Sequence, residues 1–294
     1  MKVVKFKGGL GNQLFQYVFM KALALQDSTH PIKADFLIYH HVRNDNVHVP
    51  RILDLNVNIE YATDADLQVV RKFKQRGNPK GYLSKFITAC EIILNRAYYF
   101  ERDRRHRELS TLYPFGYLDG YWQSWRHVQG LENELKKELT LKREMSPKSL
   151  EMIAKIKQTN AVFIGVRRGD YLATPANIKR YGSFGMDYYS SAIAYIKARE
   201  DNPVFYIFSD DIDWVKHNLQ FDGDVVYREK EEQTSDTEEL LIMASCQHAI
   251  IVNSTFQWWG AWLISHPSKI VIAPQKWFAD GGLVDIVPDS WVTL

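Results

Sequence analysis

The sequence predicts an α/β fold with parallel sheets, and two features support this. From residue 161 onward, short apolar runs alternate with amphipathic stretches, which is typical of strands joined by helices in a doubly wound sheet. The chain also opens with a strand, a glycine turn and a helix, the way an α/β domain begins. Its 294 residues suffice for two domains. We expect these at 1–145 and 146–294, with a final segment that can pack back on the first domain.

Composition narrows the class of protein. Apolar residues make up 46% and charged residues 24% of the chain, as in a folded globular protein. The net charge of +2 gives no bulk attraction for nucleic acid, so we expect no nucleic-acid partner. The first apolar run is too short for a signal peptide or a membrane span. Cys90 and Cys246 show no metal-ligand spacing, and we expect reduced thiols in a cytoplasmic protein, at most peripheral to the inner face of the membrane.

In the first half, residues 3–6 indicate a strand and residues 13–25 an amphipathic helix. Residues 31–115 mix short strand-like and helix-like pieces whose order the pattern does not give. Helices are predicted near 131–139 and 149–158, and the domain crossing lies between them. The second half is more regular, with predicted helices at 212–219 and after a Ser-x-x-Glu capping box at 235, and with strands at 161–166, 204–208, 225–227, 249–252 and 270–273.

Two adjacent arginines, Arg167 and Arg168, follow directly after a buried strand. Open α/β sheets bind ligands at this end of their strands, and two arginines are costly to bury without an anionic partner. The guanidinium fork matches two phosphate oxygens as lysine does not. The segment therefore predicts an anion site in which Asp170 holds one arginine and Gly169 permits a tight turn. A surface arginine pair that forms a salt bridge with Asp170 is the alternative.

Residues 253–256 follow another predicted strand and open an apolar helix. A serine or threonine at a helix start, with the free N–H groups there, makes a phosphate cradle. Ser254 as a helix cap is the alternative, and the two functions are compatible. We expect the paired tryptophans Trp258 and Trp259 to be core packing.

Ser209, Asp210 and Asp211 also follow a predicted strand. Acidic residues at a strand end commonly bind ribose hydroxyls or a base edge, and helix capping by Ser209 or Asp210 is the alternative. Asp211 and Asp213 spell the Asp-x-Asp pattern of metal-dependent sugar transferases. We expect the pattern in the first turn of a helix, where carboxylates favour the dipole, and we predict no metal.

A glycine-rich segment, 8–13, joins the first strand to the first helix. Glycines allow a backbone to approach a ligand closely, and Asn12 and Gln13 offer uncharged hydrogen bonds. The spacing differs from the G-x-G-x-x-G of dinucleotide folds.

Together these segments resemble the α-1,2-fucosyltransferases of glycosyltransferase family 11. The resemblance covers most of the chain outside residues 31–115. It rests on GGLGNQLFQYVFMKALA from residue 8, GYWQS from 120, VRRGDY from 166, FSDD from 208, CQHAIIVNSTFQWWGAWL from 246 and KIVIAPQKWF from 269. The resemblance implies a GT-B-like fold, with two Rossmann-like domains facing a cleft. It also implies inverting transfer of L-fucose from GDP-fucose to the 2-hydroxyl of a terminal galactose on a glycan acceptor, with no cofactor and no metal.

The family's site residues carry over by position. Arg167, Asp170 and Asn12 would act in catalysis, with Arg167 meeting the charge that grows on the β-phosphate. For the base, Asp170, Asp187, Glu239 and the departing phosphate stay open. Apart from the resemblance, Tyr121 and Trp122 suggest an aromatic platform for the acceptor, since aromatic faces suit the C–H side of a pyranose, and core packing is the alternative. The family usually has histidine where this chain has Gly165. Any phosphate or base contact that this histidine makes is therefore absent here, or another group supplies it. The implied donor-binding residues are Gly9, Gly11, Asn12, Gln13, Arg167, Arg168, Ser209, Asp210, Asp211, Asn253, Ser254, Thr255 and Phe256.

Overall fold

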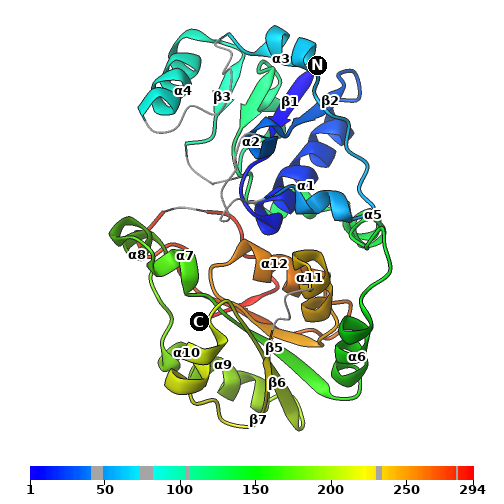
Figure 1. The fold of residues 1–294 in the computed structure, drawn as a ribbon, viewed down its shortest axis with the longest axis vertical. Helices are drawn as coiled ribbons and strands as arrows, with labels where there is room; N and C mark the ends of the chain where they lie inside the picture. The colour runs from blue at the N-terminus through cyan, green and yellow to red at the C-terminus, as the bar shows by residue number, and fades with distance from the viewer. Residues whose placement is uncertain (41–48, 73–81, 103–105, 230–233, 283) are drawn as a thin grey trace. The chain divides into compact units, whose positions relative to one another are not determined.

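The computed structural model describes the chain apart from residues 41–48, 73–81, 103–105, 230–233 and 283. The chain divides into two compact units. Unit 1 comprises Met1–Leu139 and Val284–Ile286, and unit 2 comprises Thr140–Leu283 and Val287–Leu294. Each unit contains its own sheet, and all strand pairings in both sheets are parallel (Figure 1). The predicted α/β class with parallel sheets is therefore confirmed.

Unit 1 has a four-stranded sheet in the order β2-β1-β4-β3. Two of these strands, β2 and β3, lie within residues 31–115, where the sequence pattern gave no order. The strands are β1 (Lys2–Lys5), β2 (Ile32–Asp35), β3 (Tyr98–Phe100) and β4 (Tyr117–Asp119). The helices are α1 (Leu10–Gln26), α2 (Leu37–His40), α3 (Asp64–Val70), α4 (Tyr82–Leu94) and α5 (Glu132–Glu138), with short 3₁₀ turns at Arg51–Asp54, Leu109–Leu112 and Trp125–Val128.

Helix α1 is the main packing element of unit 1. It is buried on most sides, including Leu14, Phe15 and Phe19, each with no exposed surface. A helix that is apolar nearly all round belongs to the core. The small core cluster that includes Val3 and Tyr117 joins β1 and β4 to α3.

Unit 2 has a six-stranded sheet in the order β10-β9-β8-β5-β6-β7. Counted from β5, this is the 3-2-1-4-5-6 order of a doubly wound Rossmann sheet read from one edge. The switch in winding direction falls between β5 and β8. The strands are β5 (Asn160–Val166), β6 (Pro203–Ser209), β7 (Asp224–Arg228), β8 (His248–Ile250), β9 (Val271–Ala273) and β10 (Val292–Thr293).

Several helices of unit 2 begin at side-chain caps. Ser146 caps α6 with Pro147 in the first turn, and Ser235 and Glu238 form the predicted capping box of α11. The helices are α6 (Pro147–Ile156), α7 (Gly169–Leu172), α8 (Pro175–Tyr181), α9 (Met186–Lys197), α10 (Ile212–Asn218), α11 (Asp236–Ala244) and α12 (Thr255–Leu263).

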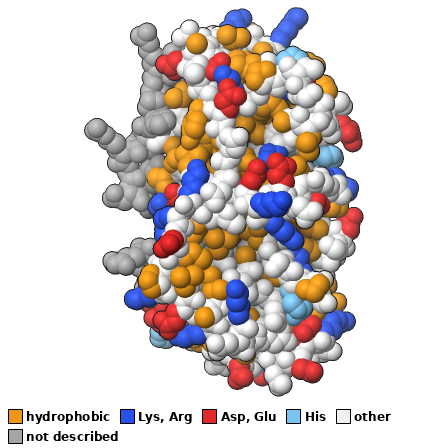
Figure 2. Space-filling view, turned by 90° about the vertical axis from the view of Figure 1, so that its right-hand side faces the viewer, with side chains coloured by type: hydrophobic (Ala, Val, Ile, Leu, Met, Phe, Trp, Pro, Cys, Tyr) orange, Lys and Arg blue, Asp and Glu red, His pale blue; other side chains and the backbone are white. Residues whose placement is uncertain are grey.

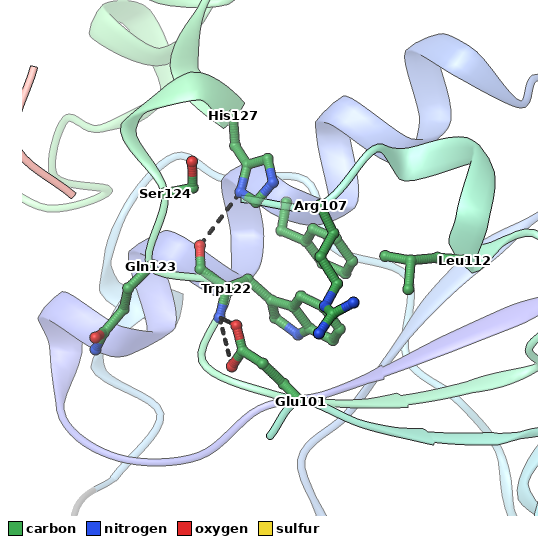
Figure 3. A pocket seen from close by; sticks show the side chains of 8 residues that line it. Glu101, Arg107, Leu112, Trp122, Gln123, Ser124 and His127 are labelled. Carbon is green, nitrogen blue, oxygen red and sulfur yellow. Dashed lines mark hydrogen bonds between the residues drawn. The ribbon is translucent and has the colours of Figure 1, made fainter. Parts of the chain in front are cut away.

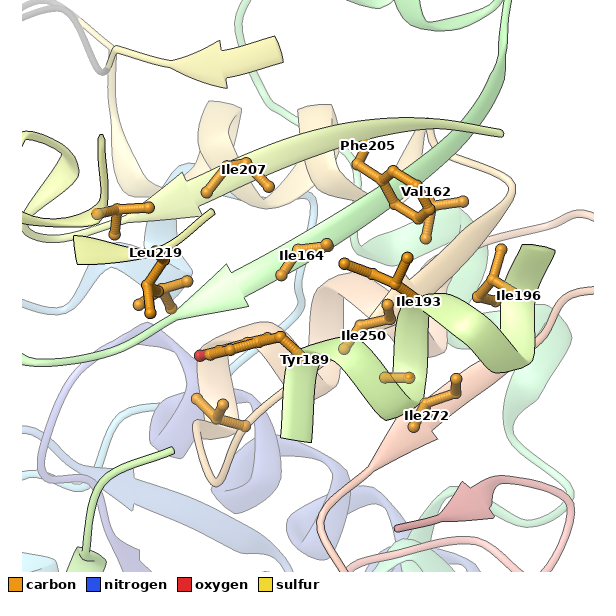
Figure 4. Packing of buried hydrophobic residues seen from close by; sticks show 14 residues of the cluster. Val162, Ile164, Tyr189, Ile193, Ile196, Phe205, Ile207, Leu219, Ile250 and Ile272 are labelled. Atoms are coloured by element: carbon orange, nitrogen blue, oxygen red, sulfur yellow. The ribbon is translucent and has the colours of Figure 1, made fainter. Parts of the chain in front are cut away.

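Alternate residues of β5 face opposite sides of the sheet. Val162, Ile164 and Val166 pack with the apolar side chains of α9 and α10 in one buried cluster (Figure 4). Because side-chain direction alternates along a strand, the odd-numbered positions of β5 face the opposite side. Gly165 confirms this, since its Cα–Cβ direction meets a side chain of α12.

The surface carries charges of both signs. Figure 2 shows Lys and Arg interspersed with Asp and Glu over the face in view. Among the described residues, no helix is both long and apolar enough to cross a bilayer. Cys90 and Cys246 are free thiols, and burial raises the pKa of Cys246 well above its usual range.

Candidate functional site

The candidate site of unit 2 lies at the carboxyl edge of its sheet. The arginine pair follows β5, residues 209–211 end β6 and lead into α10, and residues 253–256 lie between β8 and the first turn of α12. These three strands are adjacent, and β5 and β8 flank the switch in winding direction. In doubly wound sheets this is where ligands bind. The structure therefore brings together three of the segments that the sequence singled out.

Asp210 connects the two arginines. Its Oδ2 lies 3.2 Å from Nη1 of Arg167, and its Oδ1 accepts a 2.9 Å hydrogen bond from the backbone N–H of Arg168. Gly169 makes this possible, because a Cβ there would lie 2.6 Å from Asp210 Oδ2. Asp210 thus supports the arginine loop, and the support predicted from Asp170 stays a prediction. The side chain of Asp170 lies outside the described part of the structure.

Arg168 lies flat against a neighbouring aromatic ring. Its guanidinium carbon is 3.3 Å from the ring centroid of Trp214, and its Nε is 3.6 Å from Asp211 Oδ2. The side chains of Arg168 and Arg167 are 24% and 35% exposed. A cation stacked on tryptophan is held in place while part of its charge still faces solvent. Both arginines are therefore half-buried and fixed, with guanidinium surface left for an anion.

The acidic residues after β6 have structural partners. Asp211 caps α10 by accepting a 3.1 Å hydrogen bond from Trp214 N, and Ser209 Oγ accepts one of 3.0 Å from Asp211 N. The capping residue is therefore Asp211, not Ser209 or Asp210. Asp213 lies in the first turn of α10, as expected. The Asp210 carboxylate contacts the arginine loop through both oxygens, and its predicted contact with a ribose or base edge stays a prediction.

Within residues 253–256, the side chain of Asn253 connects two loops and Ser254 caps helix α12. Asn253 is 2% exposed, and its Nδ2 donates to the carbonyls of Tyr181 and Trp277 at 2.8 and 2.9 Å. Its amide N–H groups thus join loops, and its donor-binding role stays a prediction. Ser254 caps α12 by accepting from Gln257 N, as predicted. Half-buried Thr255 and Phe256 form the first turn of α12 and keep their predicted place at the edge.

Gln257 is a residue that the sequence analysis did not single out. Its side-chain amide fills the space beside Gly165, where a Cβ would lie only 2.1 to 2.5 Å from the amide atoms. Its Oε1 accepts a 3.1 Å hydrogen bond from Val252 N. The paired tryptophans Trp258 and Trp259 are fully buried, as predicted. No sequence motif reports the Gly165–Gln257 contact, because the two residues meet only through the fold.

The glycine segment of unit 1 is held by Gln13. This side chain is fully buried, and its Nε2 donates to the carbonyls of Gly8 and Val49 at 2.9 and 2.7 Å. Its Oε1 accepts from Ile52 N at 3.0 Å. The donor-binding prediction for Gln13 is therefore wrong, since its amide is fully used by the backbone. Gly11 is buried inside α1, and Gly9 is its N-cap.

Replacing Gln13 with leucine should destabilise unit 1 by about 3 kcal/mol, because three buried backbone groups lose their partners. Chemical denaturation followed by circular dichroism measures this. Gln68→Leu, at an exposed position of α3, is the matched control and should change the free energy of unfolding by less than about 0.5 kcal/mol. Equal effects of the two variants on the free energy of unfolding would contradict the structural role assigned to the Gln13 side chain.

Asn12 and a buried ion-pair cluster lie at the carboxyl edge of the sheet in unit 1. Asn12 Oδ1 accepts a 2.7 Å hydrogen bond from Gln123 Nε2. Asp119, at the end of β4, pairs with Lys5 at 2.9 Å and Lys7 at 2.6 Å. Burial alone would raise the pKa of Asp119, but the two lysines hold it well below its usual range. The sequence analysis missed this cluster, because Asp119 comes from β4, a strand that it did not identify.

The two residues predicted to bind the acceptor differ in exposure. Trp122 is 3% exposed and stacks on Phe19 with ring centroids 4.0 Å apart. Its other neighbour, Tyr99, lies 5.8 Å away in a stacked geometry. The acceptor prediction for Trp122 is thus corrected, because its indole belongs to the core. Tyr121 is half-buried, and Lys7 Nζ lies 4.5 Å from its ring centroid.

A small recess lies beside Trp122 (Figure 3). Glu101 accepts hydrogen bonds from the backbone N–H of Trp122, and His127 Nδ1 lies 3.2 Å from the Trp122 carbonyl. The recess has room for about one water molecule. It is too small for a sugar ring, although a water there could accept from Trp122 Nε1, which has no partner among the described residues.

Burial, with a smaller effect of His106, lowers the pKa of His127 from 6.5 to about 4. Between these two pH values the unfolded chain takes up a proton that the folded chain does not, so stability falls as pH falls. The expected loss is about 3 kcal/mol. His127→Gln should reduce the slope of unfolding free energy against pH in this window. The exposed control His217→Gln should keep the wild-type slope, and an unchanged slope in both would refute the effect.

No group of three or more His, Cys, Asp or Glu that could hold a metal ion occurs in the part of the chain that the structure describes. The sheet order defines a doubly wound α/β protein, with the arginine pair at the carboxyl edge of its sheet. The family model of Glycosyl transferase family 11 matches residues 1–294. The chain therefore belongs to glycosyltransferase family 11, and the resemblance carried by the six motifs is confirmed.

Three relatives show how the similarity is distributed. An α-1,2-colitosyltransferase of Escherichia coli is 29% identical over 99% of this chain and 98% of its own length. The O-antigen biosynthesis glycosyltransferase WbnK of Escherichia coli is 36% identical over 46% of this chain and 45% of its own. A galactoside α-(1,2)-fucosyltransferase 1 of Aotus azarae is 28% identical over 51% of this chain and 43% of its own. The matches to the last two span less than half of their lengths.

Two solved structures are distantly similar. The α-1,6-fucosyltransferase NodZ, soaked with GDP-fucose, has a TM-score of 0.48 at 12% identity and covers 92% of this chain and 94% of its own. POFUT1 in complex with GDP has a TM-score of 0.47 at 13% identity and covers 99% of this chain and 98% of its own.

Proposed function

We propose that this chain transfers L-fucose from GDP-fucose to the 2-hydroxyl of a terminal galactose in a glycan, with inversion and without a metal. The observation that carries the proposal is the fixed arginine pair at the end of β5, beside the switch in winding direction of a family 11 chain. The name of the Aotus azarae relative supports both the sugar and the linkage. In this proposal unit 2 binds the donor and unit 1 the acceptor, as the two domains of a GT-B enzyme.

The arginines suit the charge that develops during the transfer. The bond from the anomeric carbon to the β-phosphate oxygen breaks while the acceptor oxygen bonds to the opposite face of that carbon. Negative charge grows on the β-phosphate as the sugar becomes oxocarbenium-like. Preorganised donors that meet this charge are the largest catalytic term available without a metal. Asp210 fixes Arg167 at 3.2 Å, so the guanidinium need not be ordered during the reaction.

The acceptor hydroxyl must also lose a proton. Glu239 is a weak candidate for the base, because it is 7% exposed and lies 3.3 Å from Arg228. A carboxylate paired with arginine binds a proton poorly. Asp187 is exposed in the first turn of α9, and together with Asp170 it stays a candidate. A phosphate oxygen of the departing GDP is the further possible proton acceptor.

The test is to incubate the purified protein with GDP-β-L-fucose and a panel of small galactosides, and to determine the product linkage by NMR. The expected product carries α-fucose on O2 of galactose, with equal amounts of GDP released. The rate should be the same in excess EDTA. Loss of activity in EDTA would contradict the metal-independent mechanism. Absence of GDP release with every acceptor would favour a non-catalytic nucleotide-binding module.

Colitosyl transfer is the second candidate, because the relative that matches 99% of this chain is named a colitosyltransferase. A competition experiment with equal concentrations of GDP-fucose and GDP-colitose compares the two donors directly. We expect the larger kcat/KM for GDP-fucose. The reverse order would replace fucose with colitose and leave the assigned diphosphate site unchanged.

A further inference from the structure

The contact between Gln257 and Gly165 places an amide beside the arginine pair. Gly165 and Arg167 are two positions apart, so their side-chain directions share one face of β5 and its continuation. This is the face covered by α12, which carries Gln257. The Gln257 amide therefore occupies the path that a side chain at position 165 would take toward the carboxyl edge.

The two ends of the Gln257 amide are used differently. Oε1 accepts the 3.1 Å hydrogen bond from Val252 N, which fixes the orientation of the group. Nε2 carries two N–H donors, and none of the described residues accepts from them. The side chain is only 5% exposed. Nε2 is not among the buried side-chain atoms that lack a partner, so its N–H groups reach accessible surface, where a ligand or water can accept from them.

Ser254 caps α12, and Gln257 lies in the first turn of this helix, three residues further along the chain. The free backbone N–H groups of the helix start lie at the same end. A ligand that reaches both this turn and Arg167 would pass close to Gln257, which belongs to the same turn. The acceptor that fits two N–H groups, one or two guanidiniums and a helix start is an oxyanion with several oxygens.

We propose that Gln257 binds the diphosphate of the nucleotide sugar through Nε2, and that Gly165 is required because any larger residue would displace the amide. This proposal rests on the proposed function. In this proposal, the Gln257 side chain from α12 fills the position that faces the diphosphate. Because its amide is neutral, it keeps the same hydrogen bonds at every pH where the protein is folded. Gln257 is thus a donor-binding residue that acts beside the two arginines.

The test uses Gln257→Glu in the full chain, with GDP and guanosine as separate ligands in calorimetry. Glutamate keeps the shape and the Oε1 acceptor for Val252 N, but it replaces the donor with a negative charge. We expect the dissociation constant for GDP to rise at least about tenfold, since a hydrogen bond to a charged group is lost. The constant for guanosine, which has no phosphate, should stay within about twofold. Gln257→Met, which removes the donor without adding charge, should weaken GDP about threefold to tenfold.

Gln158→Glu is the matched control, because it adds the same charge at an exposed position at the amino end of β5. It should bind GDP like the wild type. GDP binding by Gln257→Glu within about twofold of the wild type would overturn the proposal. An equal loss of GDP and guanosine affinity would also overturn it, since that result assigns Gln257 a structural role. If the wild-type chain binds UDP or ADP but not GDP, the proposed donor fails, and the same comparison is made with the preferred diphosphate and its nucleoside.

Discussion

Arg167→Ala is expected to lower turnover by about a hundred-fold to a thousand-fold, because it removes a preorganised donor from the charge that grows on the leaving phosphate. The variant should fold, since the Arg167 side chain is 35% exposed and its partner Asp210 is 22% exposed. GDP should also bind more weakly. Steady-state kinetics with GDP-fucose and the galactoside from the panel measures kcat and KM separately.

Two further variants sharpen this test. Arg167→Lys keeps the charge but loses the fork, so it should recover only part of the lost rate. Arg199→Ala is the matched control in the same unit. Arg199 is exposed and stacks on Tyr195 at 3.6 Å from the ring centroid, and its loss should leave turnover unchanged. Wild-type turnover in Arg167→Ala would remove Arg167 from the mechanism.

Gly169→Ala has the second largest expected effect. The added Cβ would lie 2.6 Å from Asp210 Oδ2 and 3.4 Å from its Cγ, so the carboxylate must turn away. The Arg168 N–H and the Arg167 guanidinium then lose the group that positions them. Misplacing a catalytic group by about 1 Å can lower the rate about a hundred-fold. We expect kcat/KM to fall between about tenfold and a hundred-fold, with only a small change in Tm.

The route through Asp210 is tested by a double-mutant cycle. If Gly169→Ala acts by displacing Asp210, the double variant Gly169→Ala/Asp210→Ala should be no slower than Asp210→Ala alone. Gly185→Ala is the control, because a Cβ at Gly185 meets no atom within 4 Å. Additive losses in the double variant would show that Gly169 acts by another route.

The sequence predicted the candidate site best where its residues directly follow a strand. The arginine pair, the serine caps and five of the six described strands of unit 2 are carried by local patterns of apolar and polar residues, whereas the two-residue strand β10 was not predicted. The pairing of Arg167 with Asp210 is not local. It depends on the register in which Val166 lies beside Ser209 in adjacent strands, and single-sequence patterns do not contain that register. The prediction therefore assigned the supporting role to the nearer Asp170.

Unit 1 shows the other reason for incomplete prediction. Its strands β2 and β3 have only four and three residues, too few to establish a period of two. Gln13 looks like a ligand-binding residue in a glycine-rich segment, yet its partners Val49 and Ile52 are far along the chain. Trp122 has a positive φ of 56°, which is rare for a residue with a side chain. The residue with this unusual backbone conformation thus has its indole in the core.

The Gly165–Gln257 contact also limits how the two positions can change over evolutionary time. With Gln257 in place, any side chain at position 165 would meet an amide at 2.1 to 2.5 Å. A larger residue at 165 thus requires the Gln257 amide to turn away or to be replaced by a shorter side chain. The two sites should covary among homologous chains, and grafting histidine into this chain should succeed only as a paired exchange.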